Sequence, residues 1–130
     1  MVTYLLDTSI CIEAMRNCEA GLVKKLGVER HRCVVSDIVV GELLFGFRKT
    51  GRWDEARRTR RFLAGYGVVS LGLEGSEAYA LLRTDLELRG LVIGANDMLI
   101  AATALAHDAT LVSRDADFSR VIGLRLEDWR

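Results

Sequence analysis

Apolar residues along the chain fall into short blocks with two different spacings. Five blocks are rich in β-branched and aliphatic residues, and they span residues 2–6, 32–36, 68–71, 109–113 and 123–127. Blocks of this length and composition predict short strands. The first block is apolar on both faces where it ends, as expected of a strand buried in a parallel sheet.

Between these blocks, apolar residues recur every three or four positions, which predicts amphipathic helices. The predicted helices span residues 10–16, 19–27, 38–47, 48–66, 74–89 and 94–106. Candidate caps at their ends are Thr8 and Ser9, Ser36 or Asp37, Gly90, and Asn96. Strands and helices that alternate with short turns predict a mainly parallel sheet covered by helices on both faces.

Asp97 is the odd residue of the last predicted helix, because the nine residues after it are almost wholly apolar or small. Its carboxylate lies in the positive first turn, and one interpretation is that it does no more than stabilise its own helix. A carboxylate where an apolar helix enters the core also needs a polar partner, since unpaired burial is costly. The second interpretation gains weight because similarly placed acids recur along the chain.

Three further acids stand at comparable places. Asp7 directly follows the first predicted strand, Asp115 follows the fourth, and Glu42 is the single charge inside the apolar helix at 38–47. Open parallel sheets bind ligands at the carboxyl ends of their strands, so Asp7 and Asp115 are expected near Asp97. Glu42 joins them only if the tertiary fold brings it there, and it could instead lie on a narrow solvent-exposed face. Asp117 could share or replace the role of Asp115.

Four converging carboxylates would repel one another unless a cation lies between them. Oxygen ligands without histidine or cysteine favour Mg²⁺ or Mn²⁺. A zinc site is disfavoured, because the chain has three cysteines without CxxC spacing and only two histidines. The chemistry associated with such a carboxylate site is phosphodiester cleavage.

The segment at 48–66 is strongly basic and contains Trp53, Ala56, Phe62 and Leu63 as its expected inward-facing residues. A run of this kind is most often a solvated helix face, and its arginines are also suited to phosphate contacts. The candidates for phosphate contact are Arg48, Lys49, Arg57, Arg58 and Arg61.

The length of 130 residues fits one domain, residues 1–130, with a sizeable core. No apolar run approaches the roughly 20 residues of a membrane span, and the first seven residues lack the basic region of a signal peptide. We therefore expect a cytoplasmic protein. Eighteen basic residues balance eighteen acidic ones, so net charge alone indicates no polyanionic partner.

These motifs, taken together, resemble the PIN-domain ribonucleases and, within them, the VapC toxins of type II toxin–antitoxin modules. The matching stretches lie at residues 5–9, 40–43, 94–102, 111–115, 118 and 123–129, in the family's order. The resemblance implies a three-layer α/β fold with a five-stranded parallel sheet in the order 3-2-1-4-5. It also implies Mg²⁺-dependent endonucleolytic cleavage of RNA, plausibly a structured RNA such as a transfer RNA, which inhibits translation and growth.

By position, Asp7, Glu42 and Asp97 match the family's three core acids, and Asp115 matches the more variable fourth, as catalytic and metal-binding residues. Three neighbours, Thr8, Ser9 and Asn96, are candidates to orient the carboxylates or bind metal-ligated water. The resemblance further implies a homodimer that a VapB-like antitoxin neutralises in a heterotetramer or larger complex. The apolar helix at 38–47, with Trp53 nearby, suits the antitoxin groove.

Other functions fit the sequence less well. A receiver domain needs an acidic pair after the first strand and a lysine after the last, and a haloacid-dehalogenase phosphatase needs aspartate where Ser9 stands. A catalytically silent PIN fold that binds RNA or a protein is the alternative from another class. Intact acids at all four positions argue against it.

Overall fold

The computed structural model describes residues 2–129 and contains five short strands and six α-helices within them. In chain order the elements are β1 (Tyr4–Leu6), α1 (Thr8–Arg16), α2 (Ala20–Glu29), η1 (Arg30–Arg32), β2 (Cys33–Ser36), α3 (Asp37–Thr50), α4 (Trp53–Leu63), β3 (Gly67–Val69), α5 (Gly72–Leu88), α6 (Ala95–Ala106), β4 (Thr110–Val112), η2 (Ala116–Arg120) and β5 (Leu126–Glu127). No helix in this range is long and apolar enough to cross a membrane.

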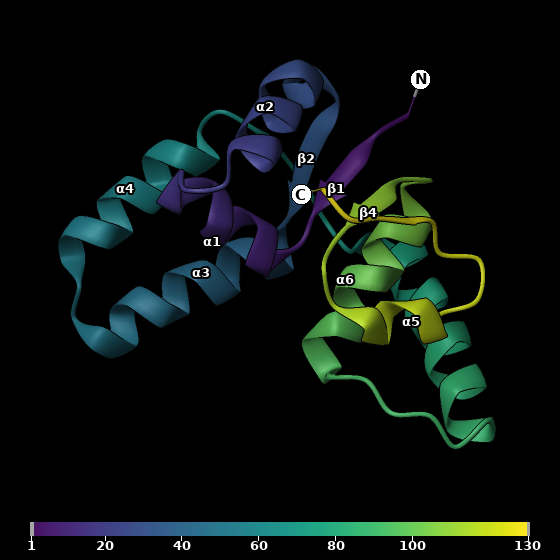
Figure 1. Ribbon diagram of the computed structural model, residues 1–130. Helices are drawn as coiled ribbons and strands as arrows, with labels where there is room; N and C mark the ends of the chain where they lie inside the picture. The colour runs from purple at the N-terminus through teal and green to yellow at the C-terminus, as the bar shows by residue number, and fades with distance from the viewer. Residues whose placement is uncertain (1, 130) are drawn as a thin grey trace.

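The strands form one sheet in the order β3-β2-β1-β4-β5, and every neighbouring pair is parallel. This confirms the order and the α/β class expected from the sequence. Helices α1 to α3 lie on one side of the sheet and α5 and α6 on the other, while α3 and α4 project from it as a helical hairpin (Figure 1). The central position of β1 leaves Leu5 and Leu6 fully buried.

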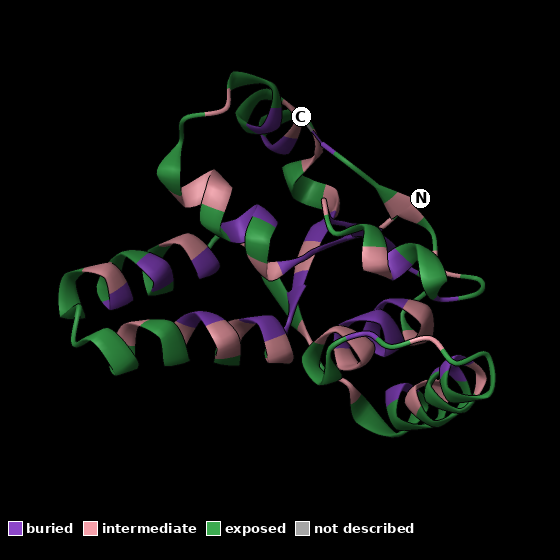
Figure 2. Ribbon diagram, turned by 60° about the horizontal axis from the view of Figure 1, so that its bottom comes forward, coloured by how far each residue is buried: buried purple, intermediate pink, exposed green. Residues whose placement is uncertain are grey.

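The core lies between the central strands and the helix faces that cover them, as the distribution of buried residues in Figure 2 shows. Helix α6 supplies an unbroken buried run from Ile100 to Ala104. Small side chains in this run let the helix pack closely on the sheet. The first turn of α6 is thereby fixed close to the carboxyl end of β1, where Asp7 lies.

Several local expectations were wrong. The N-cap of α6 is Gly94 rather than Asn96, and the N-cap of α1 is Asp7 rather than Thr8 or Ser9. Asp7 takes the cap because it leaves the strand in extended conformation and its side chain accepts from the Thr8 N–H. Trp53 is 60% exposed instead of facing inward, because a new helix starts there after a turn at Gly51, whose φ is +68°.

Candidate active site

Asp7 lies at the carboxyl end of the central strand and is 5% exposed. Its Oδ1 accepts a hydrogen bond from the Thr8 N–H at 2.8 Å. Its Oδ2 accepts from the hydroxyls of Ser113, at 2.8 Å, and Ser9, at 3.3 Å. Burial raises the pKa of Asp7, and these three hydrogen bonds oppose the rise by stabilising the ionised form. The fold thus holds this carboxylate in one orientation.

Glu42 projects from α3 toward the same edge of the sheet. Its Oε1 accepts a hydrogen bond from the Thr8 hydroxyl at 2.7 Å, and its Oε2 accepts from the Asn96 side-chain amide at 3.4 Å. The glutamate is half-buried, so it does not lie on a separate solvent-exposed face. One carboxylate thereby links the first turns of α1 and α6 to α3.

Asp97 lies in the first turn of α6 with its Oδ2 packed against the Gly94 backbone. A Cβ atom added at Gly94 would lie 3.2 Å from this oxygen, which leaves little room for a side chain there. Burial, and to a smaller extent the charges of four nearby acids, raise the pKa of Asp97 to about 6. These acids are Asp7, Asp115, Glu42 and Asp117. The other acids singled out from the sequence therefore all lie near enough to Asp97 to act on it.

Asp115 and Asp117 lie on the turn after β4 and differ in their contacts. Asp115 caps η2 by accepting from the Asp117 N–H at 2.9 Å, and it is exposed. Asp117 forms an ion pair with Arg120, with 3.4 Å between the charged atoms. Of these two acids, Asp117 is paired with a cation in these contacts, and the more exposed Asp115 is not.

The chemistry of these donors fits a hard divalent cation. The site offers carboxylate oxygens, hydroxyls and one amide, and no cysteine or histidine is among them. Across residues 2–129, no three His, Cys, Asp or Glu side chains have the arrangement needed to hold a metal ion. The raised pKa of Asp97 reflects its burial first and then the negative charge around it, which a cation would neutralise.

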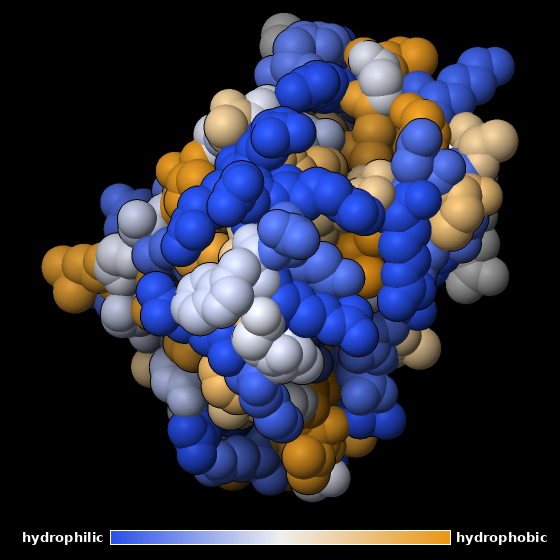
Figure 3. All heavy atoms as spheres, turned by 90° about the vertical axis from the view of Figure 1, so that its left-hand side faces the viewer, coloured by the Kyte–Doolittle hydropathy of each residue, from blue (hydrophilic) through white to orange (hydrophobic). Residues whose placement is uncertain are grey.

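The basic segment forms the outer surface of the α3–α4 hairpin. Arg48, Lys49, Arg57, Arg58 and Arg61 are all exposed, and hydrophilic side chains cover most of this side of the molecule, with hydrophobic patches between them (Figure 3). The guanidinium of Arg48 stacks over the ring of Trp53 at 5.9 Å. Exposure leaves these basic groups available to an anionic partner.

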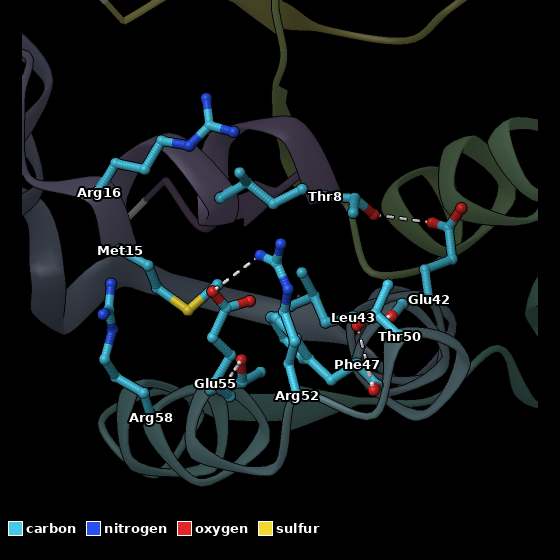
Figure 4. Close-up of a pocket in the computed structure, with 13 residues that line it drawn as sticks. Thr8, Met15, Arg16, Glu42, Leu43, Phe47, Thr50, Arg52, Glu55 and Arg58 are labelled. Carbon is cyan, nitrogen blue, oxygen red and sulfur yellow. Dashed lines mark hydrogen bonds and ion pairs between the residues drawn. The ribbon is translucent and has the colours of Figure 1, made fainter.

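A groove of about 460 Å³ runs between α1, α3 and α4, and Thr8 and Glu42 lie at one end of it (Figure 4). Its apolar wall includes Ile12, Met15, Leu43 and Phe47, and its charged lining includes Arg16, Arg52, Glu55 and Arg58. The groove thus connects an apolar channel to the acidic site. Trp53 is not among its lining residues.

Ser113 is the site residue that the sequence reasoning missed. It lies in the Ser-Arg-Asp stretch that was noted only for Asp115, and its buried hydroxyl contacts Asp7. The available signal was its position: a small hydroxyl residue directly follows the predicted strand, just as Asp7 directly follows the first strand.

Comparison with known proteins agrees with a carboxylate site that acts on phosphodiesters. Residues 4–124 match the family described as PIN domain. The chain is 34% identical to ribonuclease VapC2 of Rickettsia felis, covering 97% of each chain, and 26% identical to the tRNA(fMet)-specific endonuclease VapC of Shigella flexneri, covering 99% of each. Among solved structures, VapBC2 of Rickettsia felis bound to a promoter DNA fragment matches over the full length of both chains, with a TM-score of 0.91 and 33% identity.

Proposed function

Because the chain belongs to the PIN-domain family and to its VapC ribonucleases, we propose that it is a Mg²⁺-dependent endoribonuclease and the toxin of a type II toxin–antitoxin module. The observation that carries the proposal is the gathering of four acids around Asp97 at the carboxyl edge of a parallel sheet. The toxin would consist of one domain. It would act in the cytoplasm, where its RNA substrate lies.

Asp7, Glu42, Asp97 and Asp115 would hold the metal once their carboxylates move closer together than they lie in this structure, and Asp117 could add an oxygen once its ion pair with Arg120 breaks. Mn²⁺ is a plausible substitute, because it also prefers oxygen ligands. The chemistry that Mg²⁺ supplies when bound is Lewis acidity toward water and toward the phosphodiester oxygens.

The chain's own polar groups keep the acids in place. Thr8 and Asn96 donate to Glu42, and Ser9 donates to Asp7, so these three side chains orient carboxylates as expected of such neighbours. The raised pKa of Asp97 means that metal binding would release a proton from part of the population near pH 6.

The proposed substrate is a single-stranded loop of a structured RNA, such as a transfer RNA. A relative named tRNA(fMet)-specific endonuclease supports this class. Unstacked loop bases can be splayed into a protein site, whereas paired ones cannot. The exposed basic residues Arg48, Lys49, Arg57, Arg58 and Arg61 would contact phosphates on either side of the cleaved bond.

A VapB-like antitoxin is the proposed inhibitor, and the groove between α1, α3 and α4 is its proposed site. The apolar wall suits the apolar side of an extended or helical segment, and the acidic end suits an arginine of that segment. An antitoxin bound there would cover Glu42 and displace RNA. The solved VapBC structures that this chain resembles support an antitoxin partner.

The proposed dimer surface is the outward stripe of α5. Leu73, Leu81 and Leu88 are 77%, 75% and 83% exposed and stand eight and seven residues apart, so they share one side of the helix. A shallow apolar groove beside them is lined by Leu81, Leu82, Leu105 and Ile122, among others. A second copy related by a two-fold axis would cover both features with the same surface.

The proposal is tested with purified protein and a bacterial RNA pool, with Mg²⁺ or with EDTA. Asp97→Asn keeps the shape of the side chain and removes its charge, so we expect cleavage to fall by roughly 10²-fold or more. The control is Asp108→Asn, because Asp108 is an exposed acid at positive φ, a conformation that asparagine adopts readily. Cleavage by wild type that persists in EDTA would refute the Mg²⁺ dependence, and the absence of cleavage by folded wild type in Mg²⁺ would refute the nuclease proposal and favour a silent binding module.

A further inference from the structure

The hydroxyl of Ser113 lies between two acids that come from different strands. The residue directly follows β4 and is 6% exposed. Its backbone N–H donates to the Glu127 carbonyl at 3.0 Å, which holds the residue against β5. The side chain is therefore placed by the sheet itself and not by a free loop.

The hydrogen bonds of this hydroxyl fix the direction of its proton. Its oxygen accepts from the Asp115 N–H at 3.1 Å, and its only O–H donates to Oδ2 of Asp7 at 2.8 Å. A serine hydroxyl has one proton to donate, so both ends of the bridge are engaged at once. This single group connects the carboxylate after β1 to the backbone that carries the acid after β4.

Nothing else in the described contacts of Asp7 replaces this link. Without the Ser113 hydroxyl, Oδ2 of Asp7 keeps only the longer bond from Ser9, at 3.3 Å, although the carboxylate is buried. The Asp115 N–H would lose its acceptor at the same time. A buried carboxylate with too few donors loses the contacts that fix its orientation and is freer to rotate.

The neighbouring residue anchors the same turn from its other side. The guanidinium of Arg114 makes two hydrogen bonds to the Glu19 carboxylate and donates to the Trp129 carbonyl at 3.1 Å. These contacts tie the turn to the start of α2 and to the last described residues. Ser113 is thus the inward-facing anchor of the turn, and Arg114 is the outward-facing one.

We propose that Ser113 is a positioning residue of the nuclease site, which sets the orientation of Asp7 and the place of Asp115 through one hydroxyl. The inference rests on the proposed function of these acids. Removal of a side chain that orients a metal-binding carboxylate typically weakens metal affinity or activity by about 10- to 100-fold. The basic residues proposed to contact RNA lie on α3 and α4 and take no part in the hydrogen bonds of Ser113. The affinity for RNA should therefore not change.

The test compares Ser113→Ala, Ser113→Thr and the control Ser76→Ala in the full-length protein. Ser76 donates only to the Gly72 carbonyl within α5, so its removal reports on the loss of a hydroxyl elsewhere. Mn²⁺ affinity is measured by titration calorimetry without RNA, and kcat and KM are measured with RNA. We expect Ser113→Ala to bind Mn²⁺ about 10-fold more weakly and to lower kcat about 10-fold at unchanged KM. Ser113→Thr should regain most of both, and Ser76→Ala should match wild type.

Two results would overturn the role of Ser113. One is a Ser113→Ala protein with wild-type Mn²⁺ affinity and kcat. The other is a Ser113→Thr protein that denatures at the same urea concentration as wild type but is as impaired as Ser113→Ala. Should Ser113→Ala not fold, Ser113→Cys keeps the volume with a weaker donor, and wild-type behaviour of that variant would also count against the role. A wild type that neither binds Mn²⁺ nor cleaves RNA overturns the proposed function and this role with it.

Discussion

The Thr8 hydroxyl donates a hydrogen bond to Oε1 of Glu42, with 2.7 Å between the two oxygens. The two residues are 34 positions apart and lie on α1 and α3, so the contact is made only in the folded chain. It fixes an acid that lies inside a helix and does not directly follow a strand. Thr8 also donates its backbone N–H to Asp7, so it contacts two of the acids.

Thr8→Val should slow RNA cleavage about 10-fold, because valine keeps the shape of threonine but cannot hold Glu42. Thr8→Ser retains the hydroxyl and is expected to cleave within a few-fold of wild type. The measurement is kcat at saturating RNA and Mg²⁺ for all three proteins. A Thr8→Val protein as fast as wild type would show that Glu42 needs no such partner.

The raised pKa of Asp97 predicts how stability of the metal-free protein depends on pH. Its folded pKa, about 6, lies above the ordinary value of 3.8, so the folded state binds its proton more tightly than the unfolded state does. The associated stabilisation is complete below pH 3.8 and is lost as pH rises through 6. Asp97→Asn has no such ionisation, so its advantage over wild type should grow from pH 4 to pH 7.

Urea denaturation in EDTA measures this difference, and subtraction of the two proteins cancels the other titrating groups. Saturating Mg²⁺ should reverse the order at pH 7, because only wild type keeps the full set of ligands. An advantage of Asp97→Asn that is equal at pH 4 and pH 7 would mean that Asp97 ionises normally in the folded chain.

The double variant Arg57→Ala, Arg61→Ala should bind RNA more weakly and with a flatter dependence on salt. Each phosphate contact to a single strand contributes about 0.7 to the slope of log K against log salt, so the slope should fall by about 1.4. Calorimetric affinity for Mn²⁺ should stay the same, because both arginines lie outside the acidic site. An unchanged slope would assign these residues to an ordinary solvated helix face.

Leu81→Glu should convert a dimer into a monomer, because it places a charge at the centre of the exposed stripe on α5. Val28→Glu is the matched control, since Val28 is 62% exposed on α2 at a separate place. Light scattering coupled to size-exclusion chromatography gives the mass of each protein. A Leu81→Glu protein that remains dimeric would place the interface on another surface.

Much of the fold and part of the site follow from the sequence because they depend on local pattern. Asp7 and Asp115 stand just after strand blocks, and the order of a parallel sheet then places them on one edge. Only the capping role of Asn96 was wrong, because the helix starts two residues earlier, with Gly94 as its N-cap. Its hydrogen bond to Glu42 agrees with the carboxylate-orienting role that the family resemblance implied, and local pattern alone could not predict that contact.

Ser113 shows the same limit, because a serine after a strand is common and only its two partners make it informative. Trp53 shows the opposite error, where an aromatic side chain was expected in the core but stands at the exposed start of α4. Hydrophobicity gives a preference for burial, whereas the position of the turn at Gly51 decides which side of the helix faces inward.

The most direct test of the account is to express wild type, Asp97→Asn and Asp108→Asn in bacterial cells without an antitoxin and to sequence the new RNA ends. We expect wild type and Asp108→Asn to arrest growth and to produce ends at one or a few sites, and Asp97→Asn to do neither although it is folded. Those ends would also identify the RNA. Growth arrest and the same RNA ends with Asp97→Asn, or intact RNA with all three folded proteins, would contradict a carboxylate-dependent ribonuclease.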